Sequence, residues 1–211
     1  MRDRVVDEWR QAQLVDADRA EAHLNLGALD AELGRLQDAE REYTIAARLN
    51  PRFPGTYVNL ADLYRQQQRE DRAEQVLRRG IEMAPRNADL PHAMGLLLVR
   101  RKQVAESLPY LEKAAALAPD GSRYHYVYGV ALKSAGQEAK ALEVLTQAHE
   151  RFPGDKDILL ALAIYKRDAG RLPAALDYAR ALVALAPGDP GARRLLKELQ
   201  AQASQLGPRE R

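Results

Sequence analysis

The side chains that most often do chemistry in proteins are sparse and scattered in this sequence. Its 211 residues include no cysteine, which excludes thiolate metal sites, cysteine-linked haem and a cysteine nucleophile. The four histidines are His23, His92, His125 and His149. No two of them have the spacing that places metal ligands on one helix face, and no carboxylates join them as a ligand set. We therefore predict no metal site and no cofactor.

Sequence motifs of enzymes are also missing. The chain has no nucleophile elbow, no glycine-rich phosphate loop and no calcium-binding loop. Paired carboxylates such as Asp7-Glu8 fit helix starts and solvated faces. The sequence therefore predicts a protein that is not an enzyme.

Charge and hydropathy narrow the class of partner and the compartment. The net charge of +2 is too small to favour nucleic acid. No apolar run reaches the length of a membrane span, and the first residues contain no signal-like apolar segment. As written, the sequence predicts a cytoplasmic protein, or a periplasmic one if it is a fragment of an exported protein. Its excess of arginine over lysine, with abundant alanine and leucine, favours a GC-rich bacterial source.

Three sets of residues recur every 34 positions and remain in phase with one another. The prolines of this pattern are Pro51, Pro85, Pro119, Pro153 and Pro187. Small residues recur at Gly27, Ala61, Gly95, Gly129 and Ala163, and again at Ala39, Ala73, Ser107, Ala141 and Ala175. A fixed period of this size is typical of a stacked repeat protein.

Each repeat has the pattern of two helices. In residues 122–155, helical spacing of apolar residues runs to residue 135 and resumes at Glu138, with Gly136 between. The glycines at Gly34, Gly136 and Gly170 are expected to end the first helix in a left-handed conformation. The recurring proline ends the second helix. We expect Pro91 and Pro109 to displace the starts of their helices.

This helix–turn–helix unit resembles the tetratricopeptide repeat. Residues 122–155 show the resemblance at Tyr128-Gly129, Leu132, Ala141, Leu145, Ala148 and Pro153. It implies an all-α fold, an α-solenoid of antiparallel helix pairs in a right-handed superhelix. The full repeats are 20–53, 54–87, 88–121, 122–155 and 156–189, and a repeat position below is counted from the first residue of each range.

The ends of the chain fit the same pattern. We predict one domain over 1–206, with an orphan helix at 4–16, a capping helix at 190–204 and a flexible tail at 207–211. Asp189 is a plausible N-cap for the capping helix, with Pro190 first. The orphan helix carries Val5, Val6 and Trp9. Uncovered apolar residues of this kind predict either more chain upstream or a homodimer interface.

In the resembled family, first helices line a concave wall that binds partners. That resemblance implies a groove formed by Arg65, His92, Leu96, Arg100, Tyr126, Val130, Lys133, Leu160, Ile164 and Arg167. The groove would contain an apolar stripe formed by Leu96, Tyr126, Val130, Leu160 and Ile164, with Tyr126 as the anchor for the partner. The stripe would be bordered by the cationic side chains Arg65, Arg100, Lys133 and Arg167. The alternatives are that a tightly curved array buries the stripe on itself, or that the cations are only a solvated face.

These features predict a non-enzymatic scaffold that binds a protein or peptide partner, such as an amphipathic helix with an acidic margin. The lysine at position 5 and asparagine at position 9 by which some family members grip a terminal carboxylate are absent. The alternative is a structural segment of a larger bacterial protein, for example beside a multihaem cytochrome part, that mediates assembly.

Overall fold

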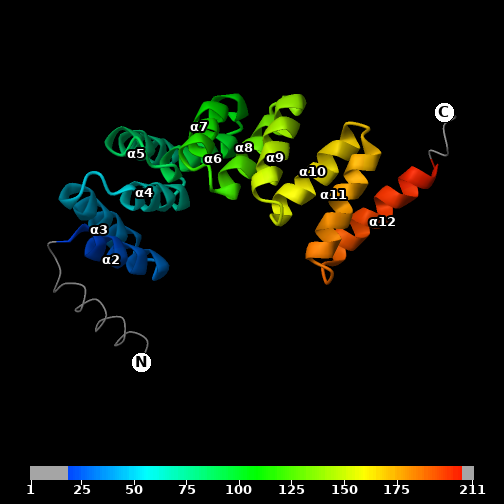
Figure 1. Cartoon of the computed structure of the whole chain (residues 1–211). Helices are drawn as coiled ribbons and strands as arrows, with labels where there is room; N and C mark the ends of the chain where they lie inside the picture. Colours follow the sequence, from blue (N-terminus) through cyan, green and yellow to red (C-terminus); the bar gives the residue numbers. More distant parts are fainter. Residues whose placement is uncertain (1–18, 206–211) are drawn as a thin grey trace. The chain divides into compact units, whose positions relative to one another are not determined.

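The computed structural model describes residues 19–205, and the regular structure in that range is entirely helical (Figure 1). The first helices of the repeats are α2 (Ala20–Glu32), α4 (Pro54–Gln66), α6 (Asp89–Arg100), α8 (Ser122–Ser134) and α10 (Lys156–Asp168). The second helices are α3 (Leu36–Leu49), α5 (Glu70–Met83), α7 (Val104–Leu117), α9 (Glu138–Arg151) and α11 (Leu172–Leu185), and α12 (Pro190–Gln205) follows. Each first helix packs most extensively on the second helix of its own repeat. The predicted all-α fold of helix pairs is confirmed.

The helices belong to two compact units, which we describe separately. Unit 1, residues 1–117, contains α2 to α7, and unit 2, residues 118–211, contains α8 to α12. The predicted helix at 4–16, with Val5, Val6 and Trp9, lies outside the described residues. The predicted tail at 207–211 also lies outside them.

The recurring proline lies in the same tight turn in every repeat. In each turn the N–H two residues after the proline donates to the carbonyl of the residue before it, at 3.0–3.1 Å. A proline suits the second position of such a turn because its φ is already fixed near −65°. The carboxylates of Asp155 and Asp189 then cap α10 and α12 by accepting backbone N–H groups. This local chemistry separates the helix pairs.

The turn inside each pair is also the same in all five repeats. The residue at repeat position 15 has a positive φ, between 59° and 77°, at Gly34, Gln68, Lys102, Gly136 and Gly170. The next N–H bonds to a carbonyl five residues earlier, at 2.8–2.9 Å, which satisfies the end of the first helix. The expectation for the three glycines is confirmed. Gln68 and Lys102 adopt the same left-handed turn although they are not glycine, which the sequence analysis did not anticipate.

The small residue at repeat position 8 lies where the two helices of a pair come closest. A Cβ atom placed on Gly129 would lie 2.6 Å from Cγ of Leu145 on α9. A Cβ on Gly27 would lie 2.5 Å from the ring of Tyr43 on α3. Real Cβ atoms do not approach this closely, so these glycines permit the packing of α8 on α9 and of α2 on α3.

Pro91 and Pro109, which lie outside the 34-residue proline pattern, affect the starts of their helices differently. α6 begins at Asp89, one repeat position later than the other first helices, as expected for a start displaced by Pro91. The expectation for Pro109 is wrong, because α7 begins at Val104, the same repeat position as the other second helices. Pro109 is exposed and lies near the helix N-terminus, so the chain loses a single early hydrogen bond rather than the first turn.

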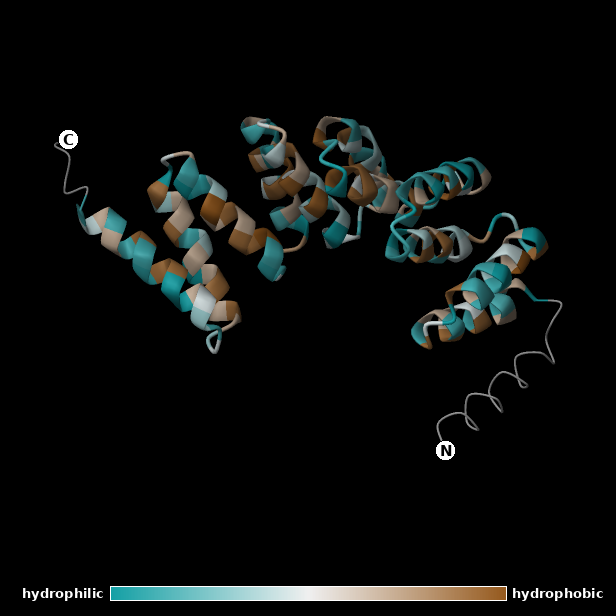
Figure 2. Ribbon diagram, turned by 180° about the vertical axis from the view of Figure 1, so that it is seen from behind, coloured by the Kyte–Doolittle hydropathy of each residue, from teal (hydrophilic) through white to brown (hydrophobic). Residues whose placement is uncertain are grey.

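Apolar side chains fill the space between the helices of each unit. In unit 1, α3, α4, α5 and α6 share one core cluster that includes Tyr43, Tyr57, Leu63, Leu77 and Met94. In unit 2 the buried residues form smaller clusters, and Ala163, Ala175 and Ala179 pack there with Leu195 and Leu199 of α12. Figure 2 shows apolar and polar residues alternating around the helices, as amphipathic packing requires.

Candidate functional site

The predicted groove residues of unit 1 lie on α4 and α6 and differ in accessibility. Arg65 donates to the carboxylate of Asp62 at 3.2 Å. Burial, and next the positive charge of Arg65, lower the pKa of Arg100, so the two guanidinium groups lie near one another. Leu96 is half-buried, whereas His92 is only 6% exposed. His92 is therefore part of the interior of unit 1 and presents little surface to a partner.

In unit 2, Tyr126 of α8 packs partly buried against the core cluster of Ile158, Ala161 and Leu162. Burial raises its pKa, and the negative charges of Asp157 and Asp155 add to the effect. Tyr126 therefore contributes to the packing of α8 on α10 and keeps part of its surface exposed.

Lys133 of α8 faces the neighbouring helix α10. Its ammonium lies 5.3 Å from the ring centroid of Tyr165 and is paired with the Glu138 carboxylate. Val130, one turn earlier on α8, is half-buried. The positive charge of Lys133 is therefore partly neutralised within unit 2, which weakens its electrostatic attraction for a partner.

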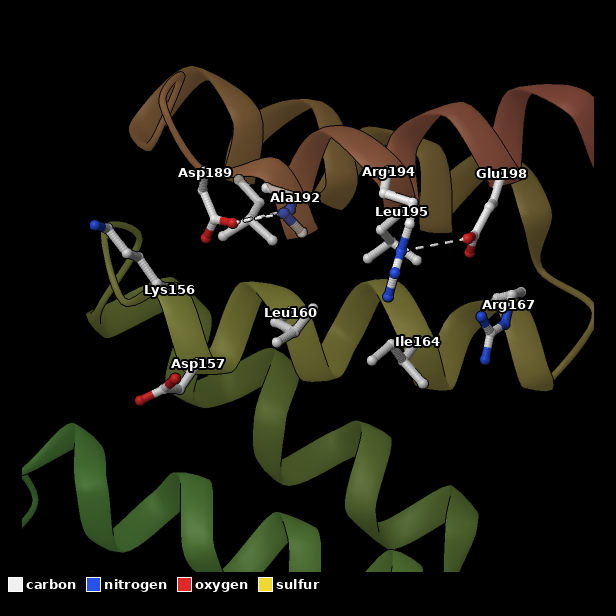
Figure 3. A pocket seen from close by; sticks show the side chains of 12 residues that line it. Lys156, Asp157, Leu160, Ile164, Arg167, Asp189, Ala192, Arg194, Leu195 and Glu198 are labelled. Atoms are coloured by element: carbon white, nitrogen blue, oxygen red, sulfur yellow. Dashed lines mark hydrogen bonds and ion pairs between the residues drawn. The ribbon is translucent and has the colours of Figure 1, made fainter.

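A groove of about 480 Å³ lies between α10 and α12, and we call it the α10–α12 groove (Figure 3). Its lining combines side chains of α10, one leucine of α11 and the start of α12. The lining residues are Lys156, Asp157, Leu160, Ile164, Arg167, Leu182, Asp189, Gly191, Ala192, Arg194, Leu195 and Glu198. It therefore brings together three predicted residues: Leu160, Ile164 and Arg167.

The floor of the α10–α12 groove is apolar and partly uncovered. Leu160 and Ile164 project from α10 toward α12, and Leu195 faces them from the opposite side (Figure 3). Leu160 is 38% exposed, whereas Leu195 is 8% exposed. Leu160 thus offers a large aliphatic surface to water at the bottom of a groove.

The charges of the α10–α12 groove are arranged at its two ends. Lys156 of α10 and Asp189 lie at one end, and Arg167 of α10 and Glu198 of α12 lie at the other (Figure 3). Arg167 is also paired with Asp168 at 2.9 Å. Asp157 and Arg194 also line the groove, which therefore holds three cations and three carboxylates, and this mixture favours orientation of a ligand rather than one sign of charge.

The α10–α12 groove combines aliphatic surface with charged side chains of both signs. Its lining contains no histidine, serine or threonine. Within residues 19–205, no group of three or more His, Cys, Asp or Glu side chains is arranged to hold a metal ion. The groove can bury apolar groups between fixed charges.

The sequence analysis missed the wall that α12 contributes. The sequence analysis treated this helix only as a cap on the last repeat. In the structure, Arg194 and Glu198 form an ion pair, with 3.6 Å between Nε and Oε1, on the rim of the groove. The signal was present in the turn at Asp189, which directs α12 back alongside the last repeat.

The architecture is that of a helical-repeat protein built from antiparallel helix pairs with a terminal helix. A sequence profile of the tetratricopeptide repeat matches residues 10–186. The chain therefore belongs to the tetratricopeptide-repeat family.

Similar proteins include both large and small members. Human protein O-mannosyl-transferase TMTC3 is 26% identical over 188 residues, which is 81% of this chain and 20% of that protein. Bacteriophage adsorption protein A of Escherichia coli K12 is 30% identical over 107 residues, 51% of this chain and 11% of that protein. This chain thus spans a fifth or less of these two relatives.

Solved structures share the fold at low identity. YrrB, described as a TPR protein with an unusual peptide-binding site, is 21% identical and superposes with a TM-score of 0.66. The match covers 90% of this chain and 97% of YrrB.

Among the described residues, no helix has both the length and the apolarity needed to cross a membrane.

Proposed function

We propose that this chain is a non-enzymatic protein-interaction scaffold whose α10–α12 groove binds a peptide segment of a partner protein. The observation that carries the proposal is Leu160, a large aliphatic side chain 38% exposed on the floor of a groove. A partner that removes such surface from water gains about 25 cal/mol per Å² of apolar area. Family membership supports this class of function, since repeat arrays present extended binding surfaces.

The spacing of the floor residues suggests the shape of the partner. Leu160 and Ile164 lie four residues apart, one turn of α10, and point to the same side. A partner helix with apolar residues at the same interval would match them. An acidic margin on that helix would meet Lys156 and Arg167, which lie near opposite ends of α10. YrrB, as a peptide-binding protein of the same fold, supports a peptide as ligand.

Other predicted groove residues have secondary roles in this proposal. Val130 and Lys133 would extend the binding wall along α8, and Tyr126 would hold α10 in place. In unit 1, Arg65, Leu96 and Arg100 would form a separate contact row. A homodimer through Val5, Val6 and Trp9 stays a prediction about residues outside the described range.

The test compares two exposed leucines of unit 2. Leu160→Asp places a charge on the groove floor, and Leu185→Asp places one at the end of α11, where the leucine is 43% exposed and outside the groove. Peptides selected from a displayed random library on the full chain serve as probes, and binding is measured by calorimetry. We expect Leu160→Asp to weaken binding about tenfold or more and Leu185→Asp to leave it unchanged.

The outcome that contradicts the proposal is equal binding to both variants. Circular dichroism and the thermal midpoint of each variant separate lost binding from lost folding. If Leu160→Asp unfolds unit 2, the milder pair Leu160→Ser and Leu185→Ser gives the same comparison.

The second candidate function is a structural segment that mediates assembly within a larger protein. It is favoured by the relatives, of which this chain spans 20% and 11%. An antibody against the chain, used on cells that express the native gene, distinguishes the two by mass. A native product near 23.6 kDa contradicts the segment hypothesis. A much larger product supports it, and the groove variants then apply within that protein.

A further inference from the structure

Unit 1 contains a second groove, on its second helices rather than its first. It lies between α3 and α5, with side chains of α4 in its lining, and has a volume of about 490 Å³. We call it the α3–α5 groove. Its lining residues are Thr44, Ala47, Arg48, Pro51, Tyr57, Leu60, Gln75, Val76 and Arg79. None of them is among the predicted groove residues, so this surface is independent of the α10–α12 groove.

The α3–α5 groove is open because one repeat position carries a small side chain. Val76 occupies repeat position 23, where the third and fifth repeats have tyrosines, Tyr110 and Tyr178. Between α5 and α7 the Tyr110 hydroxyl lies 3.4 Å from Nη1 of Arg78. Between α9 and α11 the Tyr178 ring packs edge-on against His149, with 5.3 Å between centroids. In both places a tyrosine spans the space between adjacent second helices.

The side chains opposite Val76 are also short. Thr44 occupies the repeat position that Arg78 holds one repeat later, and Ala47 occupies the position that His149 holds three repeats later. Neither can reach across to Val76 as the longer residues reach their tyrosines. The α3–α5 groove is thus the same inter-repeat space with its filling side chains removed.

The floor of the α3–α5 groove is apolar and consists of well-buried side chains. Tyr57 is 4% exposed and Leu60 is 7% exposed. The Tyr57 hydroxyl donates to the carbonyl of Pro51 at 2.7 Å, so it is already satisfied. A bound ligand therefore contacts aromatic and aliphatic carbon atoms. Because the Tyr57 hydroxyl already has a hydrogen-bond partner, covering the floor does not leave a polar group without one.

The rim of the α3–α5 groove is positive. Arg48 and Arg79 are both exposed, and no carboxylate is among the lining residues. Burial raises the pKa of Tyr57, and the positive charge of Arg79 opposes this rise. The charge on the rim therefore acts on the floor residue. The two guanidinium groups beside the apolar α3–α5 groove can pair with carboxylates of a ligand. A complementary ligand therefore carries one apolar group next to, or between, carboxylates.

We propose that the α3–α5 groove is a second binding site, for a linear peptide of a partner protein that inserts one large apolar side chain flanked by aspartate or glutamate. The apolar side chain takes the place that Tyr110 and Tyr178 take elsewhere in the array. Its acidic neighbours pair with Arg48 and Arg79. The site goes beyond the proposed function because it lies in the other unit and on the other set of helices.

The decisive variant restores the missing tyrosine. Val76→Tyr fills the groove with the residue that the third and fifth repeats already tolerate at this position, so folding is retained. The control is Val144→Tyr, the same change at the same position of the fourth repeat. On α9 the position of Gln75 is held by Glu143, whose carboxylate disfavours an acidic peptide.

The probe is a displayed random peptide library of about twelve residues, selected on the full chain and counter-selected on the Val76→Tyr chain. We expect enriched sequences with a Trp, Phe or Leu within two positions of Asp or Glu. Synthetic fluorescein-labelled copies should bind Val76→Tyr about tenfold or more weakly and Val144→Tyr normally. Arg79→Glu should weaken binding several-fold at about 50 mM salt and much less at about 500 mM.

Each failure points to a different error. No peptide that distinguishes the wild-type chain from Val76→Tyr overturns the site. Enriched peptides without acidic residues overturn the role of Arg48 and Arg79, and with it the proposed ligand class. If every enriched peptide binds Val76→Tyr normally in spite of the counter-selection and loses binding to Leu160→Asp, the selection has recovered only ligands of the α10–α12 groove, and this inference is overturned.

Discussion

Unit 1 and unit 2 are built on the same repeat but fill it with side chains of different size. Opposite the small residue at repeat position 8, unit 1 has Tyr43 and Leu111, whereas unit 2 has Leu145 and Ala179. At two of its three internal turns unit 1 uses Gln68 and Lys102, whereas both internal turns of unit 2 use glycine. The helices nevertheless begin and end at nearly the same repeat positions.

This difference shows which properties the repeat protects. Helix ends depend on turn chemistry that every repeat contains, so exchanging one side chain leaves the path of the chain unchanged. Surface grooves depend on whether side chains from separate helices meet. At repeat position 23, valine in place of tyrosine leaves a groove in unit 1 because Thr44 and Ala47 on the facing helix are short as well.

The largest expected effect comes from Gly129 of unit 2. Gly129→Leu should lower the free energy of unfolding by about 3 kcal/mol or more, because even a Cβ there would lie 2.6 Å from Leu145. Gly154→Ala is the control, since nothing lies within 4 Å of a Cβ at that turn glycine. Urea titration measures both, and similar midpoints for the two variants would contradict the close approach of α8 and α9.

A double variant sharpens the same comparison. The fifth repeat combines Ala163 with Ala179, whereas the fourth combines Gly129 with Leu145. Gly129→Ala should therefore be less destabilising in a Leu145→Ala background than alone, with a coupling of about 1 kcal/mol. Strict additivity would show that these two positions do not share one space.

An intermediate effect concerns alkaline pH and unit 1. Burial, opposed by a hydrogen bond with Asn59, raises the pKa of Tyr43 to about 12 from an ordinary 10.0. Because the folded pKa is the higher one, its contribution is complete below pH 10 and is lost as pH rises toward 12. We expect Tyr43→Phe to reduce the loss of stability between pH 8 and pH 11 by about 1 kcal/mol. An unchanged pH profile would contradict this.

The smallest effect is expected at the internal turns. Gln68→Gly should stabilise unit 1 by about 0.5–1 kcal/mol, because a left-handed residue with a Cβ is strained by more than glycine loses in unfolded-chain entropy. Gly136→Ala should destabilise unit 2 by about 1 kcal/mol for the same reason. The thermal midpoints should move in opposite directions, and shifts of the same sign would refute the equivalence of the two turns.

Much of the fold could be predicted from the sequence because its determinants are local and repeated. The proline turns, the glycines of positive φ and the helix pairs all follow from residues close together in the chain. Pro109 could not be predicted correctly. Its cost depends on where α7 starts, and Gln103 and Val104 begin that helix in spite of it.

The exposure of the predicted site residues could not be read from the sequence because it depends on contacts between helices. Repeat position 5 holds His92, Tyr126 and Leu160, which the sequence treats alike. In the structure, His92 is buried, Tyr126 packs on a core cluster and only Leu160 lies exposed in a groove. The neighbouring helix decides each case.

The sequence by itself determined the period, the helix pairs and the family, since a 34-residue pattern of turns and small residues admits one kind of packing. Only the tertiary structure decided which apolar surface remains open. Val76 faces a groove because Thr44 and Ala47 on another helix are short, and Leu160 faces one because α12 passes beside it without covering it. An unfilled space is a joint property of side chains far apart in the chain, and no single segment of the sequence contains it.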